Sequence, residues 1–196
     1  MNSPAILAEA VLRLGYPYPI TVGHCCSLAA QDAAQVERTF RKMRRARMQV
    51  VSLPMRNLYL QDRGAGRTPR LRGVTLLHEL AAAGIEVALA SDNCRDPFYA
   101  YGDHDMLEVF REATRIAHLD RPYGAWHRAV TATPADIMGL PVGRIEPGTV
   151  ADLVIFKART MNELLSRPQS DRTVLRAGEP IDTTLPDYAE LDGLFS

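Results

Sequence analysis

The apolar stretch 85–90, Ile-Glu-Val-Ala-Leu-Ala, constrains the fold of this chain more than any other feature. It is short and bounded by Gly84, which is typical of a strand buried on both faces of a parallel sheet. The polar residues Ser91 and Asp92 follow at once. In α/β folds, the reacting side chains gather at the carboxyl ends of the strands. Asp92 could therefore bind a metal, act as a general base, or only cap the next turn.

Helix and strand patterns alternate along the first 118 residues. Helical spacing and short strand patterns occur in turn in the segments 3–15, 20–23, 33–45, 49–53, 74–83, 85–90 and 105–117. This alternation predicts a parallel sheet with right-handed crossovers. Three strands cannot close a barrel, so we expect either a piece of a larger fold or a small open sheet.

Two further segments carry predictions of their own. Residues 55–73 are polar and too long for an ordinary connection, so we expect a loop that forms a lid over a site. After residue 118, a short helix is expected to begin with Thr133 as N-cap and to end near Gly139. The strands expected at 151–156 and 172–179, the second turning at Ala177-Gly178, favour a small β subdomain with an acidic tail.

The charge balance and the cysteines limit partners and location. With 23 basic and 23 acidic residues the net charge is zero, so we expect no binding to nucleic acid or an anionic membrane. No apolar run approaches the length of a bilayer span, and the first residues lack a secretory signal, so the expected location is cytoplasmic. The three cysteines, two of them adjacent, fit a reducing compartment better than a disulfide framework.

A second strand pattern, 20–23, delivers His24 at its end, followed by Cys25 and Cys26. A thiol beside an imidazole at a strand end could act as a nucleophile or redox centre. The two cysteines lack the spacing of a C-x-x-C motif, and neighbours on an extended chain point in opposite directions.

Taken together, several of these residues resemble the amidohydrolase superfamily and, within it, the bacterial cytosine deaminases. The similar features are His24 and Asp92 at strand ends, the run 93–98 (Asn-Cys-Arg-Asp-Pro-Phe), Tyr-Gly-Asp at 101–103, and the late run Gly143-x-x-x-Pro-Gly-x-x-Ala-Asp-Leu-Val. The resemblance covers nearly the whole chain but only the C-terminal half of such an enzyme. It implies an α/β fold in which residues 1–140 form the C-terminal part of a (β/α)8 barrel, about three βα units. Residues 141–196 would supply strands of a small β-sandwich subdomain and a tail.

The resemblance also implies site residues. Asp92 matches the aspartate at the end of strand eight, a catalytic metal ligand that moves the proton of the metal-bound water. His24 matches the catalytic strand-six histidine that positions and helps activate the hydroxide. Asn93 falls where relatives can carry a substrate-contacting side chain, and Phe98 follows Asp92 closely enough to border the same substrate. The implied cofactor is divalent zinc or iron, and the implied substrate is a small cyclic nucleobase-like molecule.

The rest of the family's site has no counterpart in these 196 residues. Missing are the His-x-His pair of strand one, the strand-five histidine and the glutamate that protonates the ring. The other histidines lie in or beside helical patterns and are expected to pack or to face solvent; they are His78, His104, His118 and His127. A catalytic zinc normally has three protein ligands, so we expect the metal site to be incomplete.

Three hypotheses remain open at this point. The first is a metal-dependent hydrolase that deaminates a ring C–N bond and is completed by an N-terminal segment. The second is a non-catalytic remnant or interaction module that pairs with a complete homologue, and the third is a small thiol enzyme that uses Cys25. An open half-barrel exposes strand edges, so self-association or pairing with a complementing segment is expected.

Overall fold

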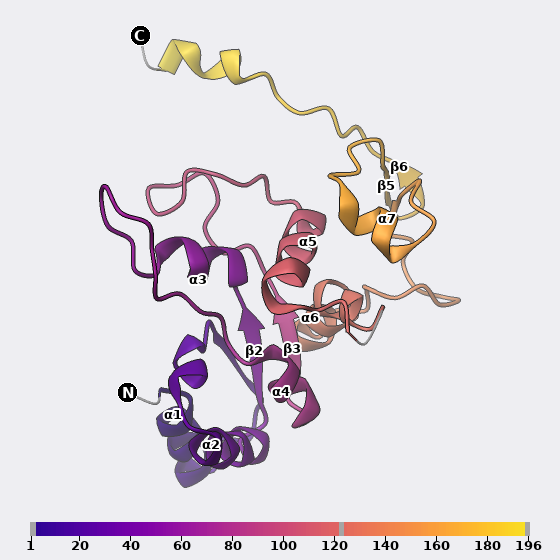
Figure 1. The fold of residues 1–196 in the computed structure, drawn as a ribbon. Helices are drawn as coiled ribbons and strands as arrows, with labels where there is room; N and C mark the ends of the chain where they lie inside the picture. Colours follow the sequence, from indigo (N-terminus) through magenta and orange to yellow (C-terminus); the bar gives the residue numbers. More distant parts are fainter. Residues whose placement is uncertain (1–2, 122–123, 195–196) are drawn as a thin grey trace.

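The computed structural model describes residues 3–121 and 124–194, and the strands of this part form two sheets (Figure 1). The first sheet contains β1 (Ile20–Gly23), β2 (Met48–Ser52) and β3 (Val87–Leu89) in the order β1-β2-β3. All neighbouring strands in it are parallel. The carboxyl ends of the three strands therefore lie at the same edge of the sheet, as the alternating pattern predicts.

Helices surround this sheet. In chain order they are α1 (Ser3–Leu14), the 3-10 helix η1 (Cys26–Ala30), α2 (Ala33–Arg45), α3 (Pro54–Leu60), α4 (Leu77–Ala82), α5 (Met106–Ala117), the 3-10 helix η2 (Trp126–Val130) and α6 (Ala132–Met138). Figure 1 shows α1 and α2 packed against each other at one end, and the arrowheads of β2 and β3 pointing toward α3 and α5. The core joins Met43 of α2, Val50 of β2 and Leu80 of α4, which are all fully buried. No helix among the described residues is long and apolar enough to cross a membrane.

The second sheet is antiparallel and lies apart from the first (Figure 1). It contains β4 (Leu153–Ile155), β5 (Thr173–Arg176) and β6 (Glu179–Pro180), and the chain turns between β5 and β6 at Ala177-Gly178, as expected. Both turn residues have positive φ, 49° and 87°, which is typical of a tight hairpin. The tail then runs outward to the 3-10 helix η3 (Tyr188–Leu194). The division at residue 140 stays a prediction.

The structure corrects the sequence predictions at four short helices. Helix α3 occupies Pro54–Leu60, inside the segment predicted as a loop, and α7 (Met161–Ser166) was not predicted. Helix α4 is shorter than the predicted 74–83. Helix α6 begins at Ala132 without a side-chain cap, so Thr133 is not its N-cap, and Asp136 instead binds the guanidinium of Arg144.

The remainder of the predicted lid, residues 61–73, is organised by side chains. Gln61 donates to the carbonyl of Gly73 and accepts from its N–H, at 2.8 and 2.7 Å, which closes the base of the loop. Asp62 accepts from the N–H groups of Arg70 and Leu71 at 2.6 and 3.1 Å. Asp62 also pairs with Arg67, and these hydrogen bonds lower the pKa of Asp62 well below its usual range. A covering role for this segment stays a prediction.

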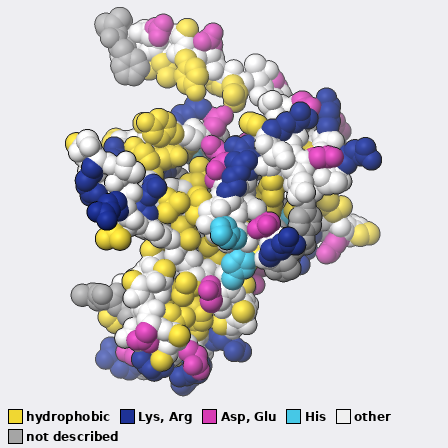
Figure 2. Space-filling model, in the orientation of Figure 1, with side chains coloured by type: hydrophobic (Ala, Val, Ile, Leu, Met, Phe, Trp, Pro, Cys, Tyr) yellow, Lys and Arg dark blue, Asp and Glu magenta, His cyan; other side chains and the backbone are white. Residues whose placement is uncertain are grey.

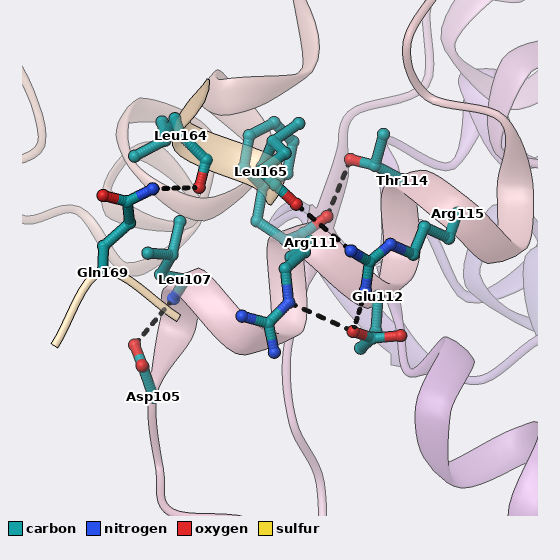
Figure 3. A network of polar contacts seen from close by, with 10 residues as sticks. Asp105, Leu107, Arg111, Glu112, Thr114, Arg115, Leu164, Leu165 and Gln169 are labelled. Atoms are coloured by element: carbon teal, nitrogen blue, oxygen red, sulfur yellow. Dashed lines mark hydrogen bonds and ion pairs between the residues drawn. The ribbon is translucent and has the colours of Figure 1, made fainter. Parts of the chain in front are cut away.

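Polar contacts connect the second sheet and α7 to α5, and Figure 3 shows the contact between α5 and α7. The guanidinium of Arg115 on α5 donates to the carbonyl of Leu165 on α7 at 3.3 Å. Arg172, just before β5, makes a two-pronged ion pair with Asp105 at 2.8 and 2.7 Å. Asp105 also caps α5 by accepting from the N–H of Leu107 at 2.9 Å. The carboxylate of Asp105 therefore caps α5 and also binds the residue that precedes β5.

Removing this carboxylate should destabilise the fold. Burial opposes the charge of Asp105, but the hydrogen bonds from Arg172 and Leu107 outweigh it and hold the pKa of Asp105 below its usual value. Asp105→Ala should lower the free energy of unfolding by about 1–3 kcal/mol at neutral pH, and Asp105→Asn, which can still cap, by less. Because a lowered pKa stabilises only above the unfolded-state value, the difference between wild type and Asp105→Asn should shrink below about pH 4. Urea unfolding at several pH values measures this, and a difference independent of pH would contradict it.

Candidate functional site

Two of the predicted site residues follow the strands of the parallel sheet. His24 comes directly after β1, and Asp92 follows β3 after a short extended segment. Both have a left-handed backbone, with φ of 62° and 68°, as has Cys25 with φ of 56°. Non-glycine residues seldom adopt this conformation, although aspartate and histidine do so more often than most, and strained positions of this kind cluster at functional sites.

The structure brings these two side chains together at the carboxyl end of the sheet. Nε2 of His24 lies 3.6 Å from Oδ2 of Asp92, which is beyond hydrogen-bond length, so the contact is electrostatic. The His24 side chain is 51 % exposed and that of Asp92 22 %. The other carboxylate oxygen of Asp92 accepts from the N–H of Asn93 at 2.8 Å. Asp92 is thus fixed by its own turn and keeps one oxygen directed toward His24.

Asn93 and Phe98 lie in the turn that follows. The amide of Asn93 donates to Oδ2 of Asp96, and Oδ1 of Asp96 accepts from the N–H groups of Phe98 and Tyr99 at 2.9 Å each. Desolvation opposes the charge of Asp96, but these hydrogen bonds lower its pKa. Phe98 is 65 % exposed. Asn93 adjoins Asp92 directly, whereas Phe98 is joined to the turn through Asp96. The contact of both residues with a substrate stays a prediction.

Helix α3 adds two residues that the sequence reasoning missed. Asn57 is buried, and its Nδ2 lies 2.8 Å from Nδ1 of His24. Arg56 is 1 % exposed, its guanidinium lies 3.7 Å above the ring of Tyr99, and its nitrogens have no hydrogen-bond partner among the described residues. Pro54 is a sequence signal for this helix, because proline is favoured in the first turn, whereas the polar composition of 55–73 predicts a loop.

The described residues cannot complete a metal site by themselves. Among residues 3–121 and 124–194 there is no group of three or more histidine, cysteine and acidic side chains that could hold a metal ion. Asp92 is therefore a single available ligand, with His24 beside it, whereas catalytic zinc normally has three protein ligands. His78 has a packing environment instead, since its Nε2 lies 3.0 Å from the carbonyl of Ala117 and its ring contacts Trp126.

Burial acts against a nucleophilic role for the adjacent cysteines Cys25 and Cys26. Cys25 is buried, and desolvation together with the neighbouring Cys26 raises the pKa of Cys25 to about 11. Burial also raises the pKa of Cys26. Because the thiolate is the nucleophile, burial disfavours the reactive form of both side chains. The thiol-enzyme hypothesis therefore has no support from this geometry.

Comparison with known proteins agrees with the resemblance seen in the sequence. A model of the amidohydrolase family matches residues 1–182. A pterin deaminase of Rhizobium rhizogenes is 61 % identical over 187 residues, which are 95 % of this chain and 43 % of that protein. The crystal structure of 5-methylcytosine deaminase from Klebsiella pneumoniae liganded with 5-fluorocytosine is 28 % identical with a TM-score of 0.73, over 94 % of this chain and 45 % of the enzyme.

A third similarity concerns the fold alone. The N-isopropylammelide isopropylaminohydrolase of Burkholderia multivorans is 23 % identical with a TM-score of 0.73, over 91 % of this chain and 43 % of that enzyme. This chain therefore spans less than half the length of each of these relatives.

Proposed function

The chain belongs to the amidohydrolase family, and we propose that it forms the C-terminal part of a hydrolytic deaminase that acts on a C–N bond of a small heterocyclic ring. The observation that carries this proposal is the meeting of His24 and Asp92 at 3.6 Å, each in a left-handed turn after a parallel strand. No contact or cavity in the described residues favours a non-catalytic remnant over this function.

In the proposed reaction the two side chains have different tasks. Asp92, with one oxygen held by the N–H of Asn93, directs the other oxygen to the open end of the sheet and moves the proton of the attacking water. His24 faces that same space and orients the reacting oxygen. A divalent zinc or iron ion, for which Asp92 would supply one ligand, would lower the pKa of bound water toward neutrality. Asn93 and Phe98 would border the ring.

For the substrate we propose a pterin-type bicyclic ring rather than cytosine. The pterin deaminase relative is 61 % identical, whereas the 5-methylcytosine deaminase is 28 % identical. The completed enzyme should therefore release ammonia from pterin with a kcat/KM at least about tenfold higher than from cytosine or 5-methylcytosine, which corresponds to about 1.4 kcal/mol of discrimination. An ammonia-release assay with the three compounds at equal concentration checks this. Higher activity on cytosine would contradict the substrate proposal and leave the deaminase proposal standing.

We propose that the remaining ligands come from a segment outside these 196 residues. We propose that residues 1–140 are about three βα units of a (β/α)8 barrel and that residues 141–196 belong to a small β-sandwich. Supporting this, β1 and β3 pair only with β2, so each has an unpaired edge among the described residues. Large apolar side chains are also exposed, and Figure 2 shows hydrophobic side chains gathered over the middle of one face. An N-terminal segment that supplies the missing strands would cover both edges.

This proposal predicts the association behaviour of the chain. Alone, it should form oligomers, and the part of the pterin deaminase relative that lies outside the match should convert these into a one-to-one complex. Analytical ultracentrifugation of the two polypeptides, separate and mixed, measures the change. A chain that stays monomeric in both samples would contradict the proposal.

A proline substitution on β1 tests whether the unpaired edge of this strand is where the added segment docks. The N–H of Ile20 donates to the carbonyl of Arg47, just before β2, and the N–H of His24 donates to the carbonyl of Val51 in β2. Successive N–H groups of a strand point to opposite sides, so the N–H of Thr21 points to the unpaired edge of β1. Thr21→Pro should therefore block pairing with the added segment and leave the backbone hydrogen bonds between β1 and β2 in place, although it removes the hydrogen bond from the Thr21 hydroxyl to the side chain of Gln49. Complex formation by this variant at the wild-type level would show that β1 is not the docking edge.

A further inference from the structure

The imidazole of His24 lies between two polar side chains, one at each nitrogen. The amide nitrogen of Asn57 is 2.8 Å from Nδ1, and Oδ2 of Asp92 is 3.6 Å from Nε2. We propose that Asn57 is a positioning residue that holds neutral His24 with its hydrogen on Nε2, directed toward Asp92.

The two neighbours favour the same tautomer. A carboxylate offers only lone pairs, so the nitrogen that faces Asp92 is favoured when it carries the hydrogen. A neutral imidazole has one N–H, and Nδ1 is then an acceptor that needs a donor opposite it. The NH2 group of Asn57 is that donor. With the amide reversed, its oxygen would face the lone pair of Nδ1, which is repulsive.

The position of Asn57 is fixed by the helix that carries it, and this position is energetically unfavourable for its side-chain oxygen. Asn57 is 6 % exposed, and its own N–H donates to the carbonyl of Leu53 at 2.9 Å within the first turn of α3. Its Oδ1 is buried without a hydrogen-bond partner among the described residues. A buried unpaired carbonyl is unfavourable, so the contact of Nδ2 with His24 is kept at the expense of the other half of the amide.

The tautomer of His24 gives His24 and Asp92 different roles in the reaction. This consequence rests on the proposed deaminase function. With hydrogen on Nε2, His24 donates a hydrogen bond to the reacting oxygen and cannot withdraw a proton through that atom. Asp92 is then the base of the pair. The tautomer itself follows from the three side chains and holds whether or not the enzyme is a deaminase.

Nitrogen NMR of the whole chain tests the tautomer directly. The histidines are labelled with 15N, and long-range 1H–15N spectra are recorded at about pH 9, above the ordinary imidazole range of about 6.5. Two histidines serve as internal references. His78 places Nε2 against the carbonyl of Ala117 and must carry its hydrogen there, whereas His127 places Nδ1 against the carbonyl of Gly124. The signals of His24 are assigned by their loss in His24→Gln.

Wild-type His24 should match His78, with the hydrogen on Nε2 in nearly all molecules. Asn57→Asp, whose carboxylate accepts only, should move the hydrogen of His24 to Nδ1, and Asn57→Leu should give a mixture of tautomers. Asn162→Asp on α7 is the control for an added charge and should leave His24 unchanged. His78 and His127 should keep their signals in every variant that folds.

A wild-type His24 with its hydrogen on Nδ1 would overturn the proposal. So would a His24 signal that does not change in a folded Asn57→Asp variant. If a variant fails to fold, the wild-type spectrum alone still tests which nitrogen of His24 carries the hydrogen.

Discussion

Asp92→Asn should lower the rate of deamination by the completed enzyme by about 10²- to 10⁴-fold, the usual contribution of a general base. The amide keeps the shape of the carboxylate, and its oxygen can still accept from the N–H of Asn93, which lies 2.8 Å from Oδ1 in the wild type. What the variant loses is a basic oxygen facing His24. Ammonia release from pterin at saturating concentration measures the loss as kcat.

An exposed aspartate serves as the matched control. Asp103 lies beyond the turn, pairs with Arg95 and is 44 % exposed in its side chain. Surface ion pairs contribute little, so Asp103→Asn should keep activity within about twofold of the wild type. Activity of Asp92→Asn within a similar margin of the wild type would contradict the assigned role of Asp92.

Gly143→Ala should produce the largest loss of stability among glycine substitutions in the late motif. Gly143 has φ of 80°, and an added Cβ would lie 2.5 Å from the carbonyl oxygen of Thr131 and 3.1 Å from the N of Ala132. Both are backbone atoms at the start of α6, so the contact cannot be relieved by a side-chain rotation. The expected loss is about 1–3 kcal/mol from overpacking, added to the conformational strain.

Gly148 of the same motif separates overpacking from strain. It also has a positive φ, 88°, but an added Cβ would meet nothing within 4 Å. Gly148→Ala should therefore show only the strain of a left-handed alanine, about 1 kcal/mol. The single tryptophan, Trp126 on η2, packs beside α6 and reports unfolding by fluorescence in urea. Equal losses in the two variants would contradict the close contact at Gly143.

The sequence predicts the parallel sheet well because its strands are marked by short apolar patterns that neighbouring residues alone define. The predicted strand 20–23 coincides with β1, and the apolar run 85–90 contains β3, whose residues are all buried. The run at β3 is apolar because the whole strand is buried, whereas β1 alternates half-buried and exposed residues. The short helices α3 and α7 have seven and six residues, too few for a helical pattern, and helices of this length are stabilised by packing rather than by propensity.

The site is predicted in part for the same reason. Parallel strands place His24 and Asp92 at one edge, but only the structure gives their separation and their left-handed turns. The polar segment 55–73 predicts a loop and so gives no position for Arg56 or Asn57, and the contact of Asn57 with His24 joins residues 33 positions apart. The ring preference depends on side chains that face a substrate, and a strand pattern carries no information about them.

The metal content of the chain, alone and in complex with the part of the pterin deaminase relative that lies outside the match, tests the central claim most directly. Elemental analysis should find almost no zinc or iron in the chain alone, because Asp92 and His24 provide fewer than three ligands. It should find about one divalent ion for each complex, together with deaminase activity. Stoichiometric metal in the chain alone, or an active complex without metal, would contradict the account.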